Sequence, residues 1–264
     1  MTTSRTLHRF YVTESLAEGS VVTLPCDQSL QIAKVLRLRP GAEIVLFDGR
    51  GGEFPARLIE VSPERTVVST GPRVPGRAEP EPAIHLAPAL LKADRFDWVV
   101  QKATELGVAA ITPVFTERTV ISLATDRAGR RRDHWQRIAV EAAEQCGRTR
   151  IPDVSEPVPF ARFLGTIPAA PTLLLWEDER AQSLAPVLAG NGGSLLMLVG
   201  PEGGFTRGEV QSAIVAGAQT VSLGPLVLRS ETAAIAGIAM ILSRFAAAHP
   251  AGSREERQPR RESD

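Results

Sequence analysis

The chain has 264 residues, of which 43% are hydrophobic and 23% charged, and its formal net charge is zero. This composition suits one large or two ordinary globular domains, and the balanced charge does not by itself indicate a nucleic-acid binder. The absence of a membrane-length apolar run or an N-terminal signal pattern, with only two cysteines (Cys26 and Cys146), leads us to expect a cytoplasmic protein without disulfides.

The first seventy residues predict a small β-barrel. Segments rich in β-branched and aromatic residues recur at close spacing and are separated by turn signals such as Pro40-Gly41, which is typical of short strands in a barrel. A helix-like stretch over 29–37 interrupts them. The predicted strands are 8–12, 20–24, 42–47, 53–59 and 66–69.

A proline-rich stretch indicates a domain boundary. Residues 71–82 contain four prolines and two glycines, a composition typical of a linker. We therefore expect an N-terminal domain over 1–76 and a second domain over 77–249. The polar tail, 250–264, has the composition of a disordered segment.

From Ile84 onward, strands and helices alternate, which predicts an α/β fold. Continuous apolar runs of strand length are typical of parallel strands covered on both faces. Helices end at Gly107 and Gly147, and Thr206 with Glu209 forms a capping box that begins another helix. The predicted strands are 108–115, 172–176, 194–199 and 220–223, and the helices include 95–106, one ending at Cys146, and 233–248.

Two segments rich in glycine and proline carry most of the functional signal. They are Leu198-Val-Gly-Pro-Glu-Gly-Gly-Phe205 and Leu223-Gly-Pro-Leu-Val-Leu-Arg-Ser-Glu-Thr232, and each joins a predicted strand to a predicted helix. Ligands of α/β proteins bind at such turns, at the carboxyl end of the sheet. We therefore predict one ligand held between two backbone loops. The alternative is that both segments are only tight strand-to-helix turns.

The residue types in these loops restrict the ligand. Neither segment has the lysine and hydroxyl of a phosphate-binding loop, and neither has the G-x-G-x-x-G spacing of a dinucleotide site. Backbone amides and carbonyls between apolar walls suit an S-adenosyl group better than a polyphosphate. A nucleotide-dependent hydrolase is disfavoured for the same reason.

Metal and covalent chemistry are not expected. The four histidines are scattered, and neither cysteine has a partner at zinc spacing. Cys146 falls on the apolar face of its predicted helix, which favours a core position over a nucleophile. The chain also lacks the G-x-S-x-G turn of the α/β-hydrolases.

Several motifs in order resemble the bacterial family of 16S ribosomal RNA uracil-N3 methyltransferases, within the SPOUT superfamily. The resemblance runs from about residue 7 to residue 246. Besides the two glycine-rich segments, it rests on His8-Arg-Phe-Tyr11, Phe47-Asp-Gly49, Gln101-Lys-Ala-Thr-Glu-Leu-Gly107, Thr116-Glu-Arg118 and Glu141-Ala-Ala-Glu-Gln-Cys-Gly-Arg148.

The resemblance implies an N-terminal PUA-like β-barrel that binds RNA, followed by a SPOUT α/β domain with a trefoil knot. It also implies S-adenosylmethionine as cofactor, a homodimer, and methylation of N3 of a uridine in 16S ribosomal RNA. From the residues themselves we expect neither a metal nor a membrane as partner. The family commonly has arginine where this chain has Leu226. Two alternatives stay open: methylation of another RNA nucleotide, and a non-catalytic RNA-binding factor in ribosome assembly.

Candidate site residues follow from the loops, the resemblance and the chemistry. Arg229 is the candidate for stabilising a uracil anion, and Glu231 or Glu202 is a candidate base, or instead a structural anchor for Arg229. RNA contacts are predicted at Arg9, Arg37, Gln145 and Arg148, against the alternative that these are ordinary surface or helix-capping residues. The predicted cofactor contacts are Leu198, Val199, Gly200, Pro201, Glu202, Gly203, Leu223, Gly224, Leu228 and Thr232.

Overall fold

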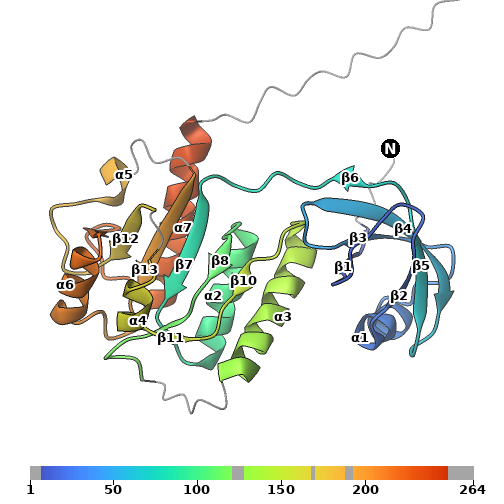
Figure 1. Ribbon diagram of the computed structural model, residues 1–264, viewed down its shortest axis with the longest axis horizontal. Coiled ribbons are helices and arrows are strands. Elements are labelled where there is room, and N and C mark those ends of the chain that lie inside the picture. Colours follow the sequence, from blue (N-terminus) through green and yellow to red (C-terminus); the bar gives the residue numbers. More distant parts are fainter. Residues whose placement is uncertain (1–6, 121–127, 168–169, 188–192, 249–264) are drawn as a thin grey trace, which may run out of the picture.

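The computed structural model describes residues 7–120, 128–167, 170–187 and 193–248, and these form two regions with separate hydrophobic cores (Figure 1). The predicted tail, 250–264, lies outside the described residues. Within the described ranges, no helix is both long and apolar enough to span a membrane.

The N-terminal region is a curled sheet of six short strands. Its strand order is β1-β3-β4-β5-β2, with β6 paired to β4, and all pairs are antiparallel except β1 with β3. Buried residues alternate along β4, so one face of the sheet packs inward around Phe10, Ile32 and Phe54. The strands are β1 (Arg9–Tyr11), β2 (Val21–Leu24), β3 (Glu43–Phe47), β4 (Gly52–Val61), β5 (Thr66–Thr70) and β6 (Val74–Pro75).

All five strands predicted in this region are present, and the helical interruption is also confirmed. It begins at Cys26 as α1 (Cys26–Leu30) and continues as a π-helical turn, η1 (Gln31–Val35). The segment directly follows Pro25, whose fixed φ suits the residue before a helix.

The second region is built on a parallel sheet with the order β10-β8-β7-β13-β12-β14. Every residue of β12 and all but the first of β13 are buried, which explains their unbroken apolar sequences. The strands are β7 (Ala83–Pro88), β8 (Ala110–Ile111), β10 (Asp153–Val154), β12 (Thr172–Leu175), β13 (Ser194–Val199) and β14 (Ala218–Val221).

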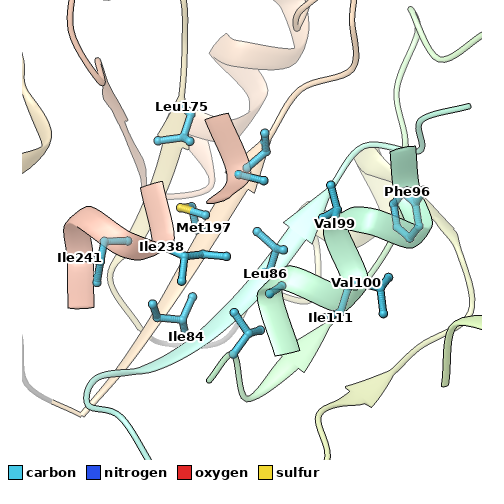
Figure 2. Close-up of a cluster of buried hydrophobic side chains, with 14 of the residues drawn as sticks. Ile84, Leu86, Phe96, Val99, Val100, Ile111, Leu175, Met197, Ile238 and Ile241 are labelled. Atoms are coloured by element: carbon cyan, nitrogen blue, oxygen red, sulfur yellow. The ribbon is translucent and has the colours of Figure 1, made fainter. Parts of the chain in front are cut away.

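Helices cover both faces of this sheet. The side chains of α2 (Ala93–Glu105), α3 (Ala128–Cys146) and α7 (Ser230–Ala248) share one core with Ile84, Leu86 and Met197 of the strands, and Figure 2 shows Ile238 of α7 in the same cluster. The opposite face packs against α4 (Phe160–Leu164) and α6 (Arg207–Val215). The short helix α5 (Leu184–Val187) contacts α7.

Several boundaries differ from the sequence predictions. The strand predicted over 108–115 is two short strands, β8 and β9 (Val114–Phe115), separated by Pro113, and β9 pairs with β11 (Val158–Pro159) in a separate sheet. Proline has no N–H to donate, so it interrupts the ladder. β14 begins two residues earlier than predicted, and α7 begins at Ser230 rather than 233.

The proline-rich stretch between the regions is packed against the protein. The Gly76 amide donates to the Gly51 carbonyl at 3.3 Å, and a Cβ added at Gly107 would lie 2.3 Å from Pro80. The composition of this stretch indicated a linker, and the structure shows in addition that it packs against both regions.

The contacts of Arg148 favour a structural role over the predicted RNA contact. Its side chain is 10% exposed and forms an ion pair with Glu79, and its Nη1 also donates to the carbonyls of Thr104 (2.9 Å) and Val108 (3.1 Å). A guanidinium so occupied connects the linker to the end of α2. Arg148 is therefore a buried structural residue. Its removal would leave the carboxylate of Glu79 without its ion-pair partner, which would destabilise the protein.

Arg9 has a similar structural position. Its side chain is 14% exposed, pairs with Glu53, donates to the carbonyl of Arg148 at 3.1 Å, and lies over the ring of Phe47. These contacts place Arg9 in the joint between the two regions. The prediction of a free cation for phosphate at this position is not supported by the geometry.

Candidate functional site

A cavity of about 270 Å³ lies beyond the carboxyl ends of β12, β13 and β14. Both glycine-rich segments contribute to its wall, as the sequence predicted for a ligand held between two loops. The predicted residues that line it are Val199, Gly200, Pro201, Glu202, Leu223, Gly224, Leu228 and Arg229.

Four predicted residues do not line the cavity. Leu198 is fully buried and packs in the core on the α4 and α6 face, because consecutive residues of a strand point to opposite faces. Gly203 packs instead against Arg118, and Thr232 is exposed on α7. Glu231 lies in the first turn of α7, next to the lining residue Ser230.

Side chains from other parts of the chain pack closely against the backbone of the first loop. Gly204 has φ +69°, and a Cβ added there would lie 1.9 Å from Glu177 Oε1, so only glycine fits without a shift. Arg118 Nη1 donates to the Gly203 carbonyl at 2.7 Å. The capping box of Thr206 and Glu209 is confirmed and begins α6 directly after this loop.

The second loop is connected to the first at the start of α7. The Ser230 hydroxyl donates to the Gly200 carbonyl in a short hydrogen bond, and Gly224 has φ +136°. Between these points Leu226 and Val227 are 78% and 75% exposed although both are apolar. The two loops are thus held side by side, with an apolar edge at the mouth of the cavity.

A third wall was missed by the sequence analysis. Leu175, Trp176 and Glu177, at the end of β12, also line the cavity. The sequence did show that these residues lie at the end of a buried parallel strand. It did not show that β12 lies between β13 and β14, which is what brings its carboxyl end to the cavity.

The sequence left open that Glu202 or Glu231 anchors Arg229, but both carboxylates form ion pairs with Arg95 instead. Glu202 Oε1 lies 3.3 Å from Arg95 Nη1, and Glu231 Oε1 lies 3.9 Å from Arg95 Nε. Arg229 lines the cavity and has no ion-pair partner within the described part of the chain. The two carboxylates are therefore anchored by Arg95, and the anchoring of Arg229 by either one is not observed.

Glu231 also has an unsatisfied oxygen. Its side chain is 14% exposed, and Oε2 is buried with no hydrogen-bond partner among the residues that the structure describes. Buried polar atoms in folded proteins usually have partners, so an acceptor left free beside a cavity is a candidate ligand contact.

The remaining RNA candidates are on the surface. Arg37 and Gln145 are both exposed, and Arg37 has φ 53°, a left-handed conformation that is uncommon for a residue with a side chain.

Cys146 is half-buried, and its thiol faces the Ala143 carbonyl. Over the ranges described, no group of three His, Cys, Asp or Glu residues is placed to hold a metal ion.

Glu144 connects α3 to the N-terminal sheet. Its Oε1 accepts a hydrogen bond from the Tyr11 amide at 2.7 Å. Burial, opposed by that hydrogen bond and assisted by the charges of Glu141 and Asp27, raises the pKa of Glu144 to about 7.

Replacing Glu144 by glutamine is expected to stabilise the protein more at pH 8 than at pH 5. Between pH 4.5 and about 7 the unfolded chain releases a proton that the folded chain retains, so wild-type stability falls as pH rises through this window. Glutamine keeps an oxygen for the Tyr11 amide and does not titrate. With allowance for solvent screening, we expect a gain of about 1–2 kcal/mol at pH 8 in urea unfolding. Equal gains at both pH values would contradict this.

Comparison with known families agrees with both regions. A family model described as an RNA methyltransferase domain matches residues 78–242, and one described as an RNA methyltransferase PUA domain matches residues 32–69. The chain is 33% identical to Ribosomal RNA small subunit methyltransferase E of Synechocystis, covering 89% of this chain and 77% of that protein. The protein of the same name from Bacillus subtilis is 28% identical, with 86% and 92% covered.

Solved structures give the same result. A Ribosomal RNA small subunit methyltransferase E from Neisseria gonorrhoeae, bound to S-adenosyl methionine, aligns with a TM-score of 0.83 and 36% identity over 90% of this chain and 97% of that one. A putative methyltransferase from Legionella pneumophila, also with bound cofactor, aligns with a TM-score of 0.80 and 31% identity, covering 92% and 98%.

Proposed function

Because this chain belongs to the RNA methyltransferase family, we propose that it transfers the methyl group of S-adenosylmethionine to N3 of a uridine in 16S ribosomal RNA. The observation that carries the proposal is the cavity between the two glycine-rich loops, in a chain 36% identical to a structure with that cofactor bound. The curated relatives are named as methyltransferases of ribosomal RNA, and two similar solved structures hold this cofactor. The choice of N3 rests on the motif resemblance.

The chemistry of the cavity fits S-adenosylmethionine. The cofactor carries a sulfonium, an ammonium and a carboxylate, and the cavity wall combines the carboxylates of Glu177 and Glu202 with the guanidinium of Arg229. Apolar side chains and main-chain groups of Leu223 and Gly200 suit an adenine edge. Glu177, with two acceptor oxygens, is our candidate for the ribose hydroxyls.

Uracil N3 carries a proton, and a residue of the protein has to accept it before the nitrogen can attack the methyl group. When bound, S-adenosylmethionine supplies a methyl group on a sulfonium that departs as a neutral thioether. Glu231 Oε2, buried and without a partner, is our candidate to accept the N3 proton, which frees the nitrogen lone pair to form the bond to carbon. Arg229, which lines the cavity, is our candidate to stabilise negative charge on the uracil oxygens.

We assign RNA binding to the N-terminal region, residues 1–76, with residues 77–249 as the methyltransferase domain. Arg37 and Gln145 are exposed and remain the candidate RNA contacts. The nearly balanced charge of the region means that affinity must come from where its cations lie. Ribosomal RNA as the proposed substrate supports a cytoplasmic location.

Homodimerisation is part of the proposal. Leu226 and Val227 at the cavity mouth, Met240 of α7 and Trp98 of α2 are exposed apolar side chains, which supports a protein interface. Sedimentation velocity of the purified chain tests it. A single species of monomer mass at micromolar concentration would reject the dimer.

A trefoil knot is also proposed. β14 is the edge strand beside β12, yet α7, which follows it, packs onto α2 and β13 near the sheet centre. The chain therefore returns past the loop at Gly200, where Ser230 is bound. This path supports a threaded C-terminal segment.

Nucleoside mapping of 16S ribosomal RNA from a deletion strain tests the main proposal. Loss of N3-methyluridine, restored by the wild-type gene, is the expected result. Loss of a different modified nucleoside would move the activity to another nucleotide. An unchanged modification pattern, together with no heat of S-adenosylmethionine binding in calorimetry, would instead favour a non-catalytic assembly factor.

A further inference from the structure

Arg95 connects the two segments that enclose the cofactor cavity. It lies in the first turn of α2, outside both glycine-rich segments, and its side chain is 43% exposed. One side of its guanidinium faces Glu202 of the first loop at 3.3 Å, and the other faces Glu231 of α7 at 3.9 Å. One cation thus holds two carboxylates that come from separate parts of the chain.

The arrangement has a physical consequence for Glu231. Two carboxylates held near the same point repel each other, and a shared cation between them removes that cost. Arg95 forms its ion pair with Oε1 of Glu231, and Oε2 is buried without a hydrogen-bond partner in the described part of the chain. The two oxygens of Glu231 therefore have different surroundings.

We propose that Arg95 is a positioning residue for methyl transfer, which anchors Glu202 and Glu231 so that Glu231 Oε2 stays directed to accept the substrate proton. The inference rests on the proposed function. Arg95 acts through the two carboxylates and needs no contact with RNA or cofactor.

A purely stabilising role accounts poorly for these contacts. Exposed ion pairs contribute about 0–1 kcal/mol, so the pair with Glu202 adds little to folding. Glu231 is different, because its side chain is 14% exposed and its orientation is restricted by burial. Small misplacement of a catalytic group can cost about 100-fold in rate, far more than such a pair contributes to stability.

The test compares Arg95→Ala and Arg95→Lys with the wild type in methylation of 16S ribosomal RNA. We expect Arg95→Ala to lower kcat about 10- to 100-fold while KM for RNA and Kd for S-adenosylmethionine change less than about threefold. Arg95→Lys keeps a cation within reach of both carboxylates and should recover most of kcat. Asp94→Asn is the control, since Asp94 is exposed in the same helical turn and has no ion pair among the residues described.

A double-mutant cycle with Glu231→Gln separates positioning from other roles. If Arg95 acts through Glu231, Arg95→Ala should lower kcat much less in the Glu231→Gln background than in the wild type. Additive losses would overturn the proposal, and so would an unchanged kcat in Arg95→Ala or an equal loss of cofactor affinity. A wild-type enzyme that fails to methylate 16S ribosomal RNA would reject the proposed function instead, which keeps the two failures distinct.

Discussion

Replacing Arg229 by alanine is expected to lower kcat about 100- to 1,000-fold, with less than about a threefold change in the Kd for S-adenosylmethionine. Arg229 lines the cavity, is exposed, and has no carboxylate partner in the described ranges, so its charge is available to a substrate. A uracil losing its N3 proton develops negative charge on its oxygens. A guanidinium placed there stabilises the transition state more than it stabilises the bound substrate.

Single-turnover methylation at saturating cofactor, combined with calorimetry, measures the two quantities separately. Arg229→Lys is the matched variant, because it keeps the charge and loses the planar pair of donors. We expect it to recover only part of the rate. If Arg229→Ala loses cofactor affinity as much as it loses kcat, the residue serves binding and not the transition state.

Gly200→Val is expected to raise the Kd for S-adenosylmethionine about 100-fold or more. A Cβ at Gly200 would lie 3.1 Å from Phe205 Cδ2 and 3.2 Å from the Phe205 amide nitrogen. Phe205 is buried and packs against Phe160, so it cannot move away without disturbing that core. The loop itself must then shift, which changes the wall of the cavity and the carbonyl that binds Ser230.

Isothermal titration with the cofactor measures this effect directly. Gly200→Ala, with one added methyl group, should give an intermediate loss. Gly208→Ala is the control, because a Cβ there meets only Thr206 Oγ1 at 3.9 Å. Wild-type affinity in Gly200→Val, with the protein folded, would show that this loop does not form the cofactor pocket.

The sequence predicted the parts of the site that depend on neighbouring residues. Both glycine-rich loops line the cavity, and the capping box at Thr206 is confirmed. The strand-to-helix alternation and the curled N-terminal sheet were also correct. These features follow from local rules such as periodicity, capping and turn chemistry, which act over a few residues.

The same local rules did not predict contacts between residues that are distant along the chain. Arg148 resembled a surface cation near the end of a helix, but the fold buries it against Glu79 and two carbonyls of the α2 end. Arg9 is occupied in the same joint. Charge in the sequence does not say whether a side chain will find a partner distant along the chain, and that partner decides whether it is free to bind RNA.

The sequence by itself therefore determined the class of fold, the two loops that line the cavity and the residue types available there. Only the tertiary structure decided that Trp176 and Glu177 complete the cavity and that Arg95 holds Glu202 and Glu231. The physical reason is that strand order in a parallel sheet is set by how whole elements pack. Side chains separated by more than a hundred residues come within ion-pair distance only after that packing is complete.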